Sequence, residues 1–349
     1  MSSIEIAGRR IGGGEPVYVI AELSANHGQR LETALELVRA AKAAGADAVK
    51  LQTYTADTLT IACDRPEFRI GKGTIWEGRT LHDLYEEAYM PWEWQPQVQE
   101  AVERLGLHCF SSPFDDSAVD FLEKMGVPAY KIASFELVDL PLIRRAARTG
   151  KPMIMSTGMA SRAEIEEALR TAREAGAKEI ALLKCTSGYP ARCEEMNLRT
   201  IPDMAASFAV PVGLSDHTLD DTAAIAAVAL GACIVEKHLT LSRSQPGPDS
   251  AFSLEPEEFK RLVDSIRTTE KALGSVSYEA SPHEAPSRIF RRSLFVVRDV
   301  KAGEVLTAAN VRSIRPGHGL HTRHLDEAIG RHAACDITAG TPLMWELIR

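Results

Sequence analysis

Short apolar segments alternate with amphipathic helical segments along most of this chain, and this alternation limits its fold more than any other feature. The pattern is typical of repeated strand–helix units that build a parallel sheet. At residues 33–44, for example, apolar positions recur every three or four residues, and Gly45 follows as a stop signal. Eight candidate strands are recognised at Tyr18–Ala21, Ala48–Gln52, Leu107–Ser111, Ala129–Ala133, Met153–Ser156, Ile180–Lys184, Val210–Leu214 and Cys233–Lys237.

Eight such units predict an α/β fold, a closed (β/α)8 TIM barrel, over residues 1–273. An open, doubly wound sheet is the alternative, but no G-x-G-x-x-G motif follows a strand, so the barrel is preferred. The strands are evenly spaced except at Tyr54–Pro96, a segment too long for an ordinary strand-to-helix connection. In a barrel this insertion leaves from the catalytic end, so it either helps to cover the active site or packs as a decoration.

The chain beyond residue 273 has a different character. Residues 274–291 are rich in Ser, Pro and Glu and predict a linker. Fully extended, the linker spans roughly 60 Å, which is long enough to carry the C-terminal residues to another subunit. Residues 292–349 predict a small β-rich domain with an internal near-repeat, because RDVKAGEVLT at 298–307 recurs as CDITAGTPLM at 335–344.

Composition excludes several classes of protein. The formal net charge is -8 and no basic block stands out, which argues against sequence-independent nucleic-acid binding. No segment approaches about 18 uninterrupted apolar residues, so no membrane-spanning helix is expected. The N-terminal residues lack the apolar core of a signal peptide. The six cysteines include no C-x-x-C pair and are interpreted as free thiols of a cytoplasmic protein.

Every predicted strand ends in polar residues, which is where barrels of this class carry their catalytic groups. Lys50, Lys131 and Lys184 lie within otherwise apolar strands, although buried lysines are rare unless an anion pairs with them. Several serines follow the same strands, so the pattern indicates a cradle for phosphate or carboxylate. A Schiff-base aldolase that uses Lys131 or Lys184 is the alternative. Because a Schiff base needs only one lysine, the number of lysines argues mildly against it.

Two histidines end neighbouring strands of the predicted barrel. His217 follows the seventh strand and His238 the eighth, with Glu236 beside it. Two imidazoles at adjacent strand ends can hold one divalent cation and leave positions open for substrate and water. Glu22 ends the first strand and is a candidate for proton transfer.

These residues lie in motifs that resemble those of the sialic acid synthase family, in the same order and over nearly the whole chain. The motifs are AELSANH, VKLQTY, KIAS, STGM, GLSDHT, EKHLT and GPDSAFSLEP, and the later segment SIRPGHGL resembles the antifreeze-like (SAF) domain of that family. Within the family, LSANH, KIASFE and the insertion TIWEGRTLHDLYEEAYMPWEW look closest to the pseudaminic acid synthase branch.

The resemblance implies a transferase that condenses phosphoenolpyruvate with the open-chain form of an acetamido sugar, with C–O cleavage and release of phosphate. For the pseudaminic branch the sugar is 2,4-diacetamido-2,4,6-trideoxy-L-altrose, and the metal is Mn²⁺ or Mg²⁺. An N-acetylneuraminate or legionaminate synthase of the same family is the near alternative. A carbohydrate-binding protein that kept the barrel is the non-enzyme alternative, and the intact Glu22, His217 and His238 argue against it.

The resemblance also implies roles for individual residues. The metal would be held by His217 and His238, with Glu22 and Glu236 as catalytic groups. The phosphoenolpyruvate-binding residues would be Lys50, Ser112, Lys131, Ser134, Ser156, Ser187 and Ser215, and the sugar-binding residues Gln52, Tyr189, Asp249 and Arg315. Because Arg315 matches an arginine that reaches the partner subunit, a homodimer with swapped C-terminal domains is expected. Phe135 stands where the sialic acid branch has glycine and would add apolar surface near the sugar.

Overall fold

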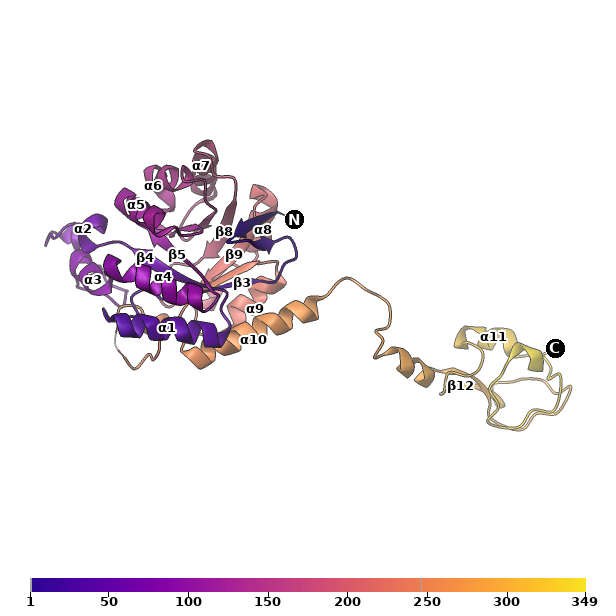
Figure 1. Ribbon diagram of the computed structural model, residues 1–349. Coiled ribbons are helices and arrows are strands. Elements are labelled where there is room, and N and C mark those ends of the chain that lie inside the picture. The colour runs from indigo at the N-terminus through magenta and orange to yellow at the C-terminus, as the bar shows by residue number, and fades with distance from the viewer. Residues whose placement is uncertain (1, 246) are drawn as a thin grey trace. The chain divides into compact units, whose positions relative to one another are not determined.

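A computed structural model describes residues 2–245 and 247–349, which form two compact units divided after Gly274. Over the described residues, the first unit is a closed barrel of parallel strands in which β10 pairs with β3 (Figure 1). Its strands are β3 (Tyr18–Glu22), β4 (Ala48–Thr53), β5 (His108–Pro113), β6 (Tyr130–Ile132), β7 (Met153–Ser156), β8 (Ile180–Cys185), β9 (Val212–Asp216) and β10 (Ile234–His238). The predicted TIM barrel is confirmed, and each predicted strand is found within two residues of its expected bounds.

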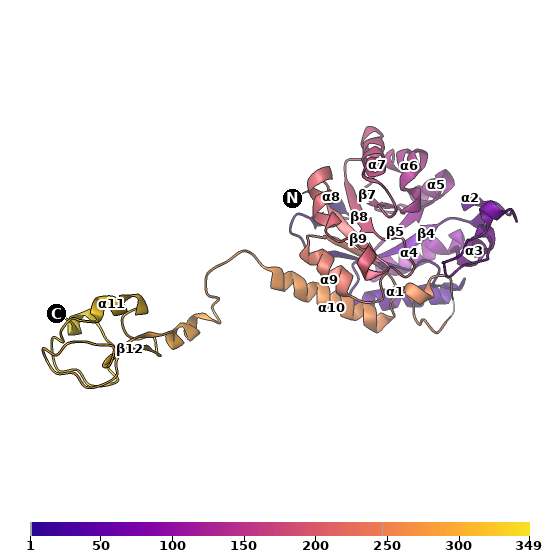
Figure 2. The same ribbon diagram turned by 180° about the vertical axis from the view of Figure 1, so that it is seen from behind.

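Amphipathic helices surround the barrel (Figures 1 and 2). They are α1 (Leu31–Ala44), α4 (Gln95–Arg104), α5 (Asp116–Met125), α6 (Leu140–Ala147), α7 (Arg162–Glu174), α8 (Thr200–Phe208), α9 (Thr222–Ala229) and α10 (Pro256–Leu273). Helix α1 buries Leu37, Val38 and Ala41 and ends at Gly45, whose φ of 87° is the left-handed conformation that glycine adopts most easily. Among the described helices, none has both the length and the apolar character needed to cross a membrane.

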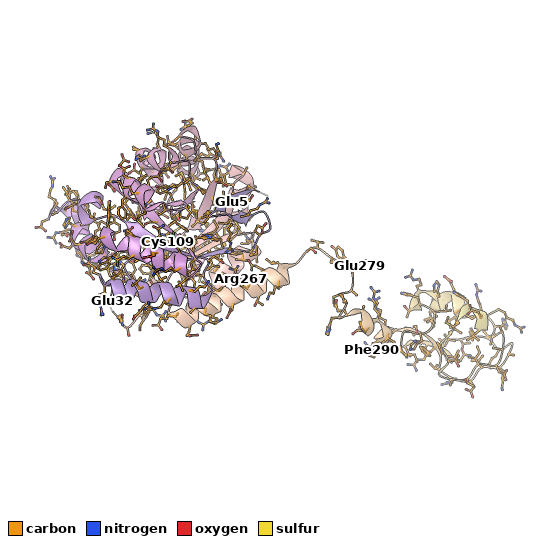
Figure 3. The ribbon with its side chains drawn as sticks, viewed as in Figure 1. Glu5, Glu32, Cys109, Arg267, Glu279 and Phe290 are labelled. Carbon is orange, nitrogen blue, oxygen red and sulfur yellow. The ribbon has the colours of Figure 1, made fainter. Side chains whose placement is uncertain are left out.

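An N-terminal hairpin, which was not predicted from the sequence, packs at the N-terminal ends of the barrel strands. It consists of β1 (Ser3–Ile6) and β2 (Arg9–Gly12), and its isoleucine side chains join the barrel core. At the same end of the barrel, Arg267 of α10 (labelled in Figure 3) donates to Asp47 at 2.8 Å and to the carbonyl oxygen of Val17 at 2.7 Å. Charged side chains at this end of the barrel thus connect the starts of the strands. The candidate catalytic residues lie at the opposite end, where the strands terminate.

The long insertion after β4 folds back over the C-terminal ends of the strands. It contains the short helices α2 (Ala56–Leu59) and α3 (Leu81–Ala88). The indole of Trp76 donates to the carbonyl oxygen of Pro248 at 2.9 Å, which ties the insertion to the loop that follows β10. Of the two roles expected for the insertion, the structure supports a cover for the catalytic end.

The second unit contains an antiparallel hairpin of β11 (Ser293–Val296) and β12 (Val311–Ile314), followed by the short helix α11 (Leu325–Ala328). Its core is a small cluster of apolar side chains that includes Leu294 and Leu343. The predicted small β-rich domain is confirmed.

The near-repeat of the second unit is a local twofold symmetry. Val300 and Ile337 exchange two backbone hydrogen bonds, of 2.9 and 2.8 Å. Asp336 accepts from the amide of Ala302 at 2.8 Å, and the equivalent Asp299 accepts from the amide of Ala339 at the same distance. The two copies of the repeat therefore pair with each other through equivalent contacts rather than standing side by side.

Close packing within the barrel leaves no room for a side chain at Gly213 in β9. A Cβ atom there would lie 2.4 Å from the carbonyl oxygen of Ile234 and 2.7 Å from Leu183 Cδ2. We expect Gly213→Ala to lower the free energy of unfolding by about 2 kcal/mol, as overpacked cores do, in urea denaturation. Gly71→Ala is the control, because a Cβ there meets nothing within 4 Å. Equal stability of the two variants would contradict the packing described here.

Candidate active site

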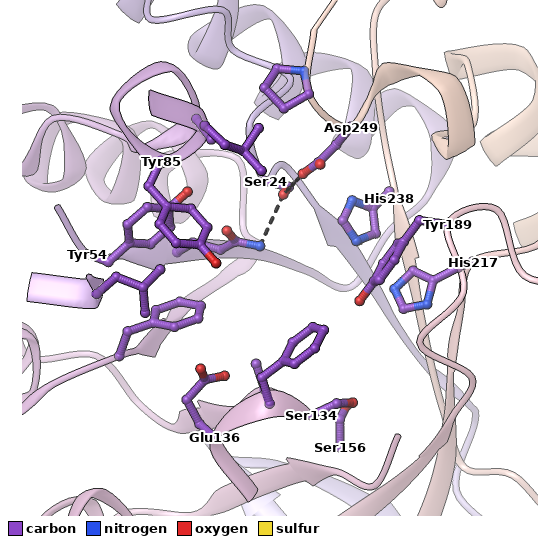
Figure 4. A pocket seen from close by; sticks show the side chains of 18 of the residues that line it. Ser24, Tyr54, Tyr85, Ser134, Glu136, Ser156, Tyr189, His217, His238 and Asp249 are labelled. Atoms are coloured by element: carbon purple, nitrogen blue, oxygen red, sulfur yellow. Dashed lines mark hydrogen bonds between the residues drawn. The ribbon is translucent and has the colours of Figure 1, made fainter. Parts of the chain in front are cut away.

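A cavity of about 370 Å³ opens at the C-terminal ends of the barrel strands (Figure 4). The predicted site residues that line it are Lys50, Gln52, Lys131, Ser134, Ser156, Tyr189, Ser215, His217, Glu236, His238 and Asp249. Chain segments far apart in the sequence are thus brought to one place, as the parallel barrel requires. Arg315 belongs to the second unit, where it lies beside Arg292 and His321 around a surface hollow.

Two lysines and two glutamates form a buried array at the base of the cavity. Lys50 makes an ion pair with Glu22, and its Nζ lies 3.8 Å from Glu236 Oε2. Lys131 Nζ donates to Glu236 Oε1 at 3.2 Å. All four side chains are at most 4% exposed, so each charge depends on its neighbours rather than on water.

The two carboxyl groups of this array have opposite pKa shifts. Burial raises the pKa of Glu22 to about 7, against the opposing charge of Lys50. Burial acts on Glu236 as well, but Lys131 and Lys50 outweigh it and bring the pKa of Glu236 to about 2. Near neutral pH, Glu22 can therefore take up or release a proton while Glu236 stays ionised.

Small polar groups form one corner of the cavity around Gly158. The Gly158 amide donates to Ser134 Oγ at 3.1 Å. A Cβ on Gly158 would lie 2.2 Å from Ser187 Oγ and 2.7 Å from Ser134 Oγ, so only glycine lets both hydroxyl groups keep these positions. Ser156 Oγ is buried and has no hydrogen-bond partner among the described residues. Hydroxyl and amide donors gathered in this way suit the oxygens of an anion.

Four barrel residues expected at the cavity do not line it, namely Glu22, Ser187, Ser112 and Lys184. Ser112 is fully buried and lies 3.4 Å from Lys50 Nζ, so it touches the lysine rather than the open space. Lys184 was expected to join the other lysines, and this expectation is wrong. Because side chains alternate along β8 and Cys185 faces the cavity, Lys184 faces away and donates to the carbonyl oxygen of Cys185 at 2.8 Å.

The two histidines face each other across one side of the cavity (Figure 4), with ring centroids 5.3 Å apart. His217 Nδ1 lies 3.1 Å from the carbonyl oxygen of Thr186. If Nδ1–H donates there, Nε2 is left with a free lone pair. His238 Nδ1 is buried without a hydrogen-bond partner in the described part of the chain. Burial holds the pKa of His238 well below its usual value, which favours the neutral imidazole that metals require.

These histidines fit part of a metal site. Across residues 2–245 and 247–349, no group of three or more His, Cys, Asp or Glu side chains is arranged to hold a metal ion. Burial lowers the pKa of His217, but its hydrogen bond and charge interaction with Cys185 outweigh burial and raise it, so His217 would have to release a proton before it binds a metal. The two imidazoles would then supply two ligands, and oxygens from water or substrate would have to complete the set. Glu236 accepts from Lys131 and from Ser215, so its contacts do not support a role in orienting the neighbouring His238.

A buried ion pair fixes the backbone that carries both histidines. Asp216 and Lys237 precede His217 and His238 and are register partners on β9 and β10. Their side chains are fully buried, and Lys237 Nζ lies 2.6 Å from Asp216 Oδ2. Lys237 also donates to Thr218 Oγ1 at 3.2 Å. The pair lies on the outer face of the barrel and holds the two strand ends together.

Two cavity residues were not identified from the sequence. Glu136 lies in a 3-10 turn after β6, lines the cavity, and has a buried Oε2 with no hydrogen-bond partner among the described residues. Burial raises the pKa of Glu136 to about 7. Cys185 Sγ lies 3.9 Å from His217 Nδ1. Burial would raise the pKa of Cys185, but the hydrogen bond and charge of His217 bring it to about 7. Glu136 lies in the motif KIASFE. Acidic residues are common in loops, so its position in the sequence alone did not identify it as a site residue.

The raised pKa of Glu136 predicts a pH-dependent stability difference. Between pH 4.5 and 7 the folded protein keeps a proton that the unfolded chain has released, so this group makes stability fall as pH rises through that window. Relative to wild type, Glu136→Gln should therefore gain about 2 kcal/mol of unfolding free energy from pH 4.5 to 7.5 in urea titrations.

Glu123→Gln is the control of opposite sign. Burial alone would raise the pKa of Glu123. Hydrogen bonds from Lys151 and Tyr130 together have the larger and opposite effect, so its pKa lies below the usual value. This variant should lose stability relative to wild type as pH rises. A Glu136→Gln difference that does not change with pH would contradict the burial of this carboxyl group.

Comparison with known proteins agrees with this geometry. Residues 37–278 match the NeuB family and residues 291–349 match the SAF domain. The chain is 45% identical to a pseudaminic acid synthase of Campylobacter jejuni subsp. jejuni, covering 94% of this chain and 95% of that one. It is 43% identical to the pseudaminic acid synthase of Helicobacter pylori, covering 94% and 97%.

A solved structure of a similar protein supports the same family relationship. The N-acetylneuraminic acid (sialic acid) synthetase of Leptospira borgpetersenii, in complex with citrate, superposes with a TM-score of 0.73 at 31% identity, covering 82% of this chain and 95% of that one. The barrel and the second unit thus both have counterparts in one group of enzymes. The chain belongs to the NeuB family of phosphoenolpyruvate-dependent nonulosonic acid synthases and carries a SAF domain.

Proposed function

We propose that this protein is a pseudaminic acid synthase. It condenses phosphoenolpyruvate with open-chain 2,4-diacetamido-2,4,6-trideoxy-L-altrose and water to give a nine-carbon 2-keto acid and phosphate. The observation that carries the reaction is the buried array of Lys50, Glu22, Glu236 and Lys131, of which all but Glu22 line the same cavity as His217 and His238. The similarity to pseudaminic acid synthases over 94% of the chain supports the choice of sugar.

Phosphoenolpyruvate binds at the base of the cavity in this proposal. Lys50 and Lys131 offer two ammonium groups to its phosphate and carboxylate, and Gly158 allows the hydroxyl groups of Ser134 and Ser187 to pack close together beside it. The hydroxyl groups that face or border this space belong to Ser134, Ser156, Ser187 and Ser215, while Ser112 supports Lys50 from behind.

The sugar occupies the outer part of the cavity, where polar and apolar groups lie opposite one another. Gln52, Tyr189 and Asp249 supply polar contacts. The insertion and the loops after β5 and β6 supply an apolar wall of Leu59, Ile70, Leu81, Leu84, Phe114 and Phe135. The proposed sugar carries three methyl groups, one at its deoxygenated end and one on each acetyl group, and these favour an apolar wall.

The chemistry follows from the protonation states of the carboxyl groups. The enol carbon C3 of phosphoenolpyruvate bonds to the sugar's aldehyde carbon, and positive charge develops at C2. The ionised Glu236 stabilises that charge. Water adds at C2 and gives one proton to Glu22. The C–O bond to phosphate then breaks, and the new hydroxyl group at C2 gives its proton to the departing phosphate, which leaves the C2 ketone. The former aldehyde oxygen takes up a proton, for which the candidate donor is Glu136, which lines the cavity and whose Oε2 has no hydrogen-bond partner among the described residues.

A divalent cation and a second copy of the chain complete the proposed site. His217 and His238 would hold Mn²⁺ or Mg²⁺, which as a Lewis acid polarises the aldehyde oxygen when bound. In a homodimer with exchanged C-terminal domains, Arg315 of each copy would reach the sugar end of the other's cavity. The linker, at roughly 60 Å when extended, permits this exchange.

The first test is phosphate release from phosphoenolpyruvate with Mn²⁺, comparing the altrose-configured sugar with N-acetylmannosamine, each with and without EDTA. We expect EDTA-sensitive release with the first sugar only. Phosphoenolpyruvate labelled with oxygen-18 at the bridging position should release labelled phosphate, because the C–O bond breaks. Release with N-acetylmannosamine alone would overturn the choice of sugar, and unlabelled phosphate would overturn the bond cleavage.

Gly158 tests the position of the anion. Gly158→Ala should raise the KM for phosphoenolpyruvate at least about tenfold, because its Cβ would displace the hydroxyl groups of Ser134 and Ser187. Gly188→Ala is the matched control in a neighbouring loop, since a Cβ there makes only ordinary contacts at 3.6 Å. Steady-state kinetics at saturating sugar measure both variants. An unchanged KM in Gly158→Ala would place the anion elsewhere.

A further inference from the structure

Ser24 has an unfavourable backbone conformation at the edge of the cavity. It follows β3 and has a φ of 44°, in the left-handed region that favours glycine. A residue with a Cβ pays about 1 kcal/mol or more to stay there. Ser24 is nevertheless 4% exposed and lines the cavity. Glycine would adopt this backbone conformation with less strain. What serine adds at this position is its hydroxyl group.

The hydroxyl group of Ser24 joins two side chains that were expected to face the sugar. Ser24 Oγ donates to Asp249 Oδ2, and Gln52 Nε2 donates to Ser24 Oγ at 3.0 Å. Dashed lines in Figure 4 mark both contacts of Ser24. The backbone amide of Ser24 donates to Glu22 Oε1 at 3.0 Å. One residue thus connects the β4 strand, the loop after β10 and the catalytic array.

Hydrogen-bond chemistry determines which end of Gln52 faces Ser24. A hydroxyl group has one proton to donate, and an ionised carboxylate can only accept. Because the proton of Ser24 goes to Asp249, Ser24 Oγ must accept from the amide, so the NH2 end of Gln52 is the end that it holds. The carbonyl Oε1 of Gln52 and the second carboxylate oxygen of Asp249 are then left for the ligand. Both are acceptors, so they match a donor such as an acetamido N–H or a sugar hydroxyl.

We infer that Ser24 is a positioning and specificity residue for the sugar. Its backbone is strained, and in this conformation its hydroxyl group orients Gln52 and Asp249 as a pair of acceptors for a sugar N–H or O–H. This inference rests on the proposed function, because it names the recognition chemistry of the same cavity. The hydroxyl group of Ser24 contacts Gln52 and Asp249, whereas Glu22 is held by the backbone amide of Ser24, which a change of side chain keeps. The effect of losing the hydroxyl group is therefore expected at the sugar end.

Two variants separate the hydroxyl group from the backbone. Ser24→Ala removes the hydroxyl and keeps the strain, whereas Ser24→Gly removes both. We expect each to raise the sugar KM about tenfold and to leave the KM for phosphoenolpyruvate within about twofold, because an acceptor pair loses its orientation. Ser24→Gly should also have a Tm equal to or above that of Ser24→Ala. Sugar binding to the phosphoenolpyruvate-loaded protein is followed by the shift in Tm as well, which needs no turnover.

Ala209→Gly is the matched control for strain. Ala209 has a φ of 54° at the C-terminal end of α8 and lies outside the cavity, so its glycine variant should raise Tm and leave both KM values unchanged. A double variant tests whether Ser24 acts through Gln52. On a Gln52→Ala background, Ser24→Ala should raise the sugar KM by a smaller factor than it does in the otherwise wild-type protein.

The outcomes distinguish this inference from the proposed function. A wild-type protein that turns over the sugar while both Ser24 variants keep its KM overturns the role of Ser24 alone. Equal losses in the KM values for sugar and phosphoenolpyruvate also overturn it, since they indicate general disruption. A wild-type protein that neither binds nor turns over any acetamido sugar overturns the proposed function, and this inference falls with it.

Discussion

The attraction between two buried lysines and two buried glutamates is the interaction on which this cavity depends. A lone charge at such depth would cost several kcal/mol, and each of these groups is stabilised mainly by its neighbours. When all four are ionised the array is neutral. Because the pKa of Glu22 is near 7, one proton converts the array to a net positive charge with Lys50 and Lys131 facing a single carboxylate, Glu236.

Strand register is what makes this array possible. Glu22 pairs with Lys50 between β3 and β4, and Glu236 pairs with Ser215 between β10 and β9. Side chains alternate between the two faces of a strand, so a slip of one residue would turn these charges toward the helices. The same alternation places Asp216 on the outer face, where its buried ion pair holds the strand ends instead of meeting substrate. Chemistry and support thus come from adjacent positions in the chain.

The sequence predicted the barrel well because its signal repeats eight times, and each strand and helix supports the assignment of the next. It did not reveal the N-terminal hairpin, whose four-residue strands are too short to show a period. Lys184 was misplaced because an apolar strand with a polar end does not show which face that end takes. Glu136 was missed because only the folded loop shows that its carboxyl group is buried and faces the cavity. The assigned roles of the cavity residues remain proposals that their positions support.

The two ends of the cavity come from parts of the chain with different constraints. The charged end is built from strand positions, where a change of residue disturbs the register and packing of the whole barrel. The apolar wall comes largely from the insertion after β4, with Leu59, Leu81 and Leu84 on its short helices. Loops of this kind tolerate replacement far better than barrel strands do. The reaction is therefore tied to the fold, whereas the choice of sugar can change through the insertion and through single loop residues such as Ser24, without rebuilding the site that binds the anion.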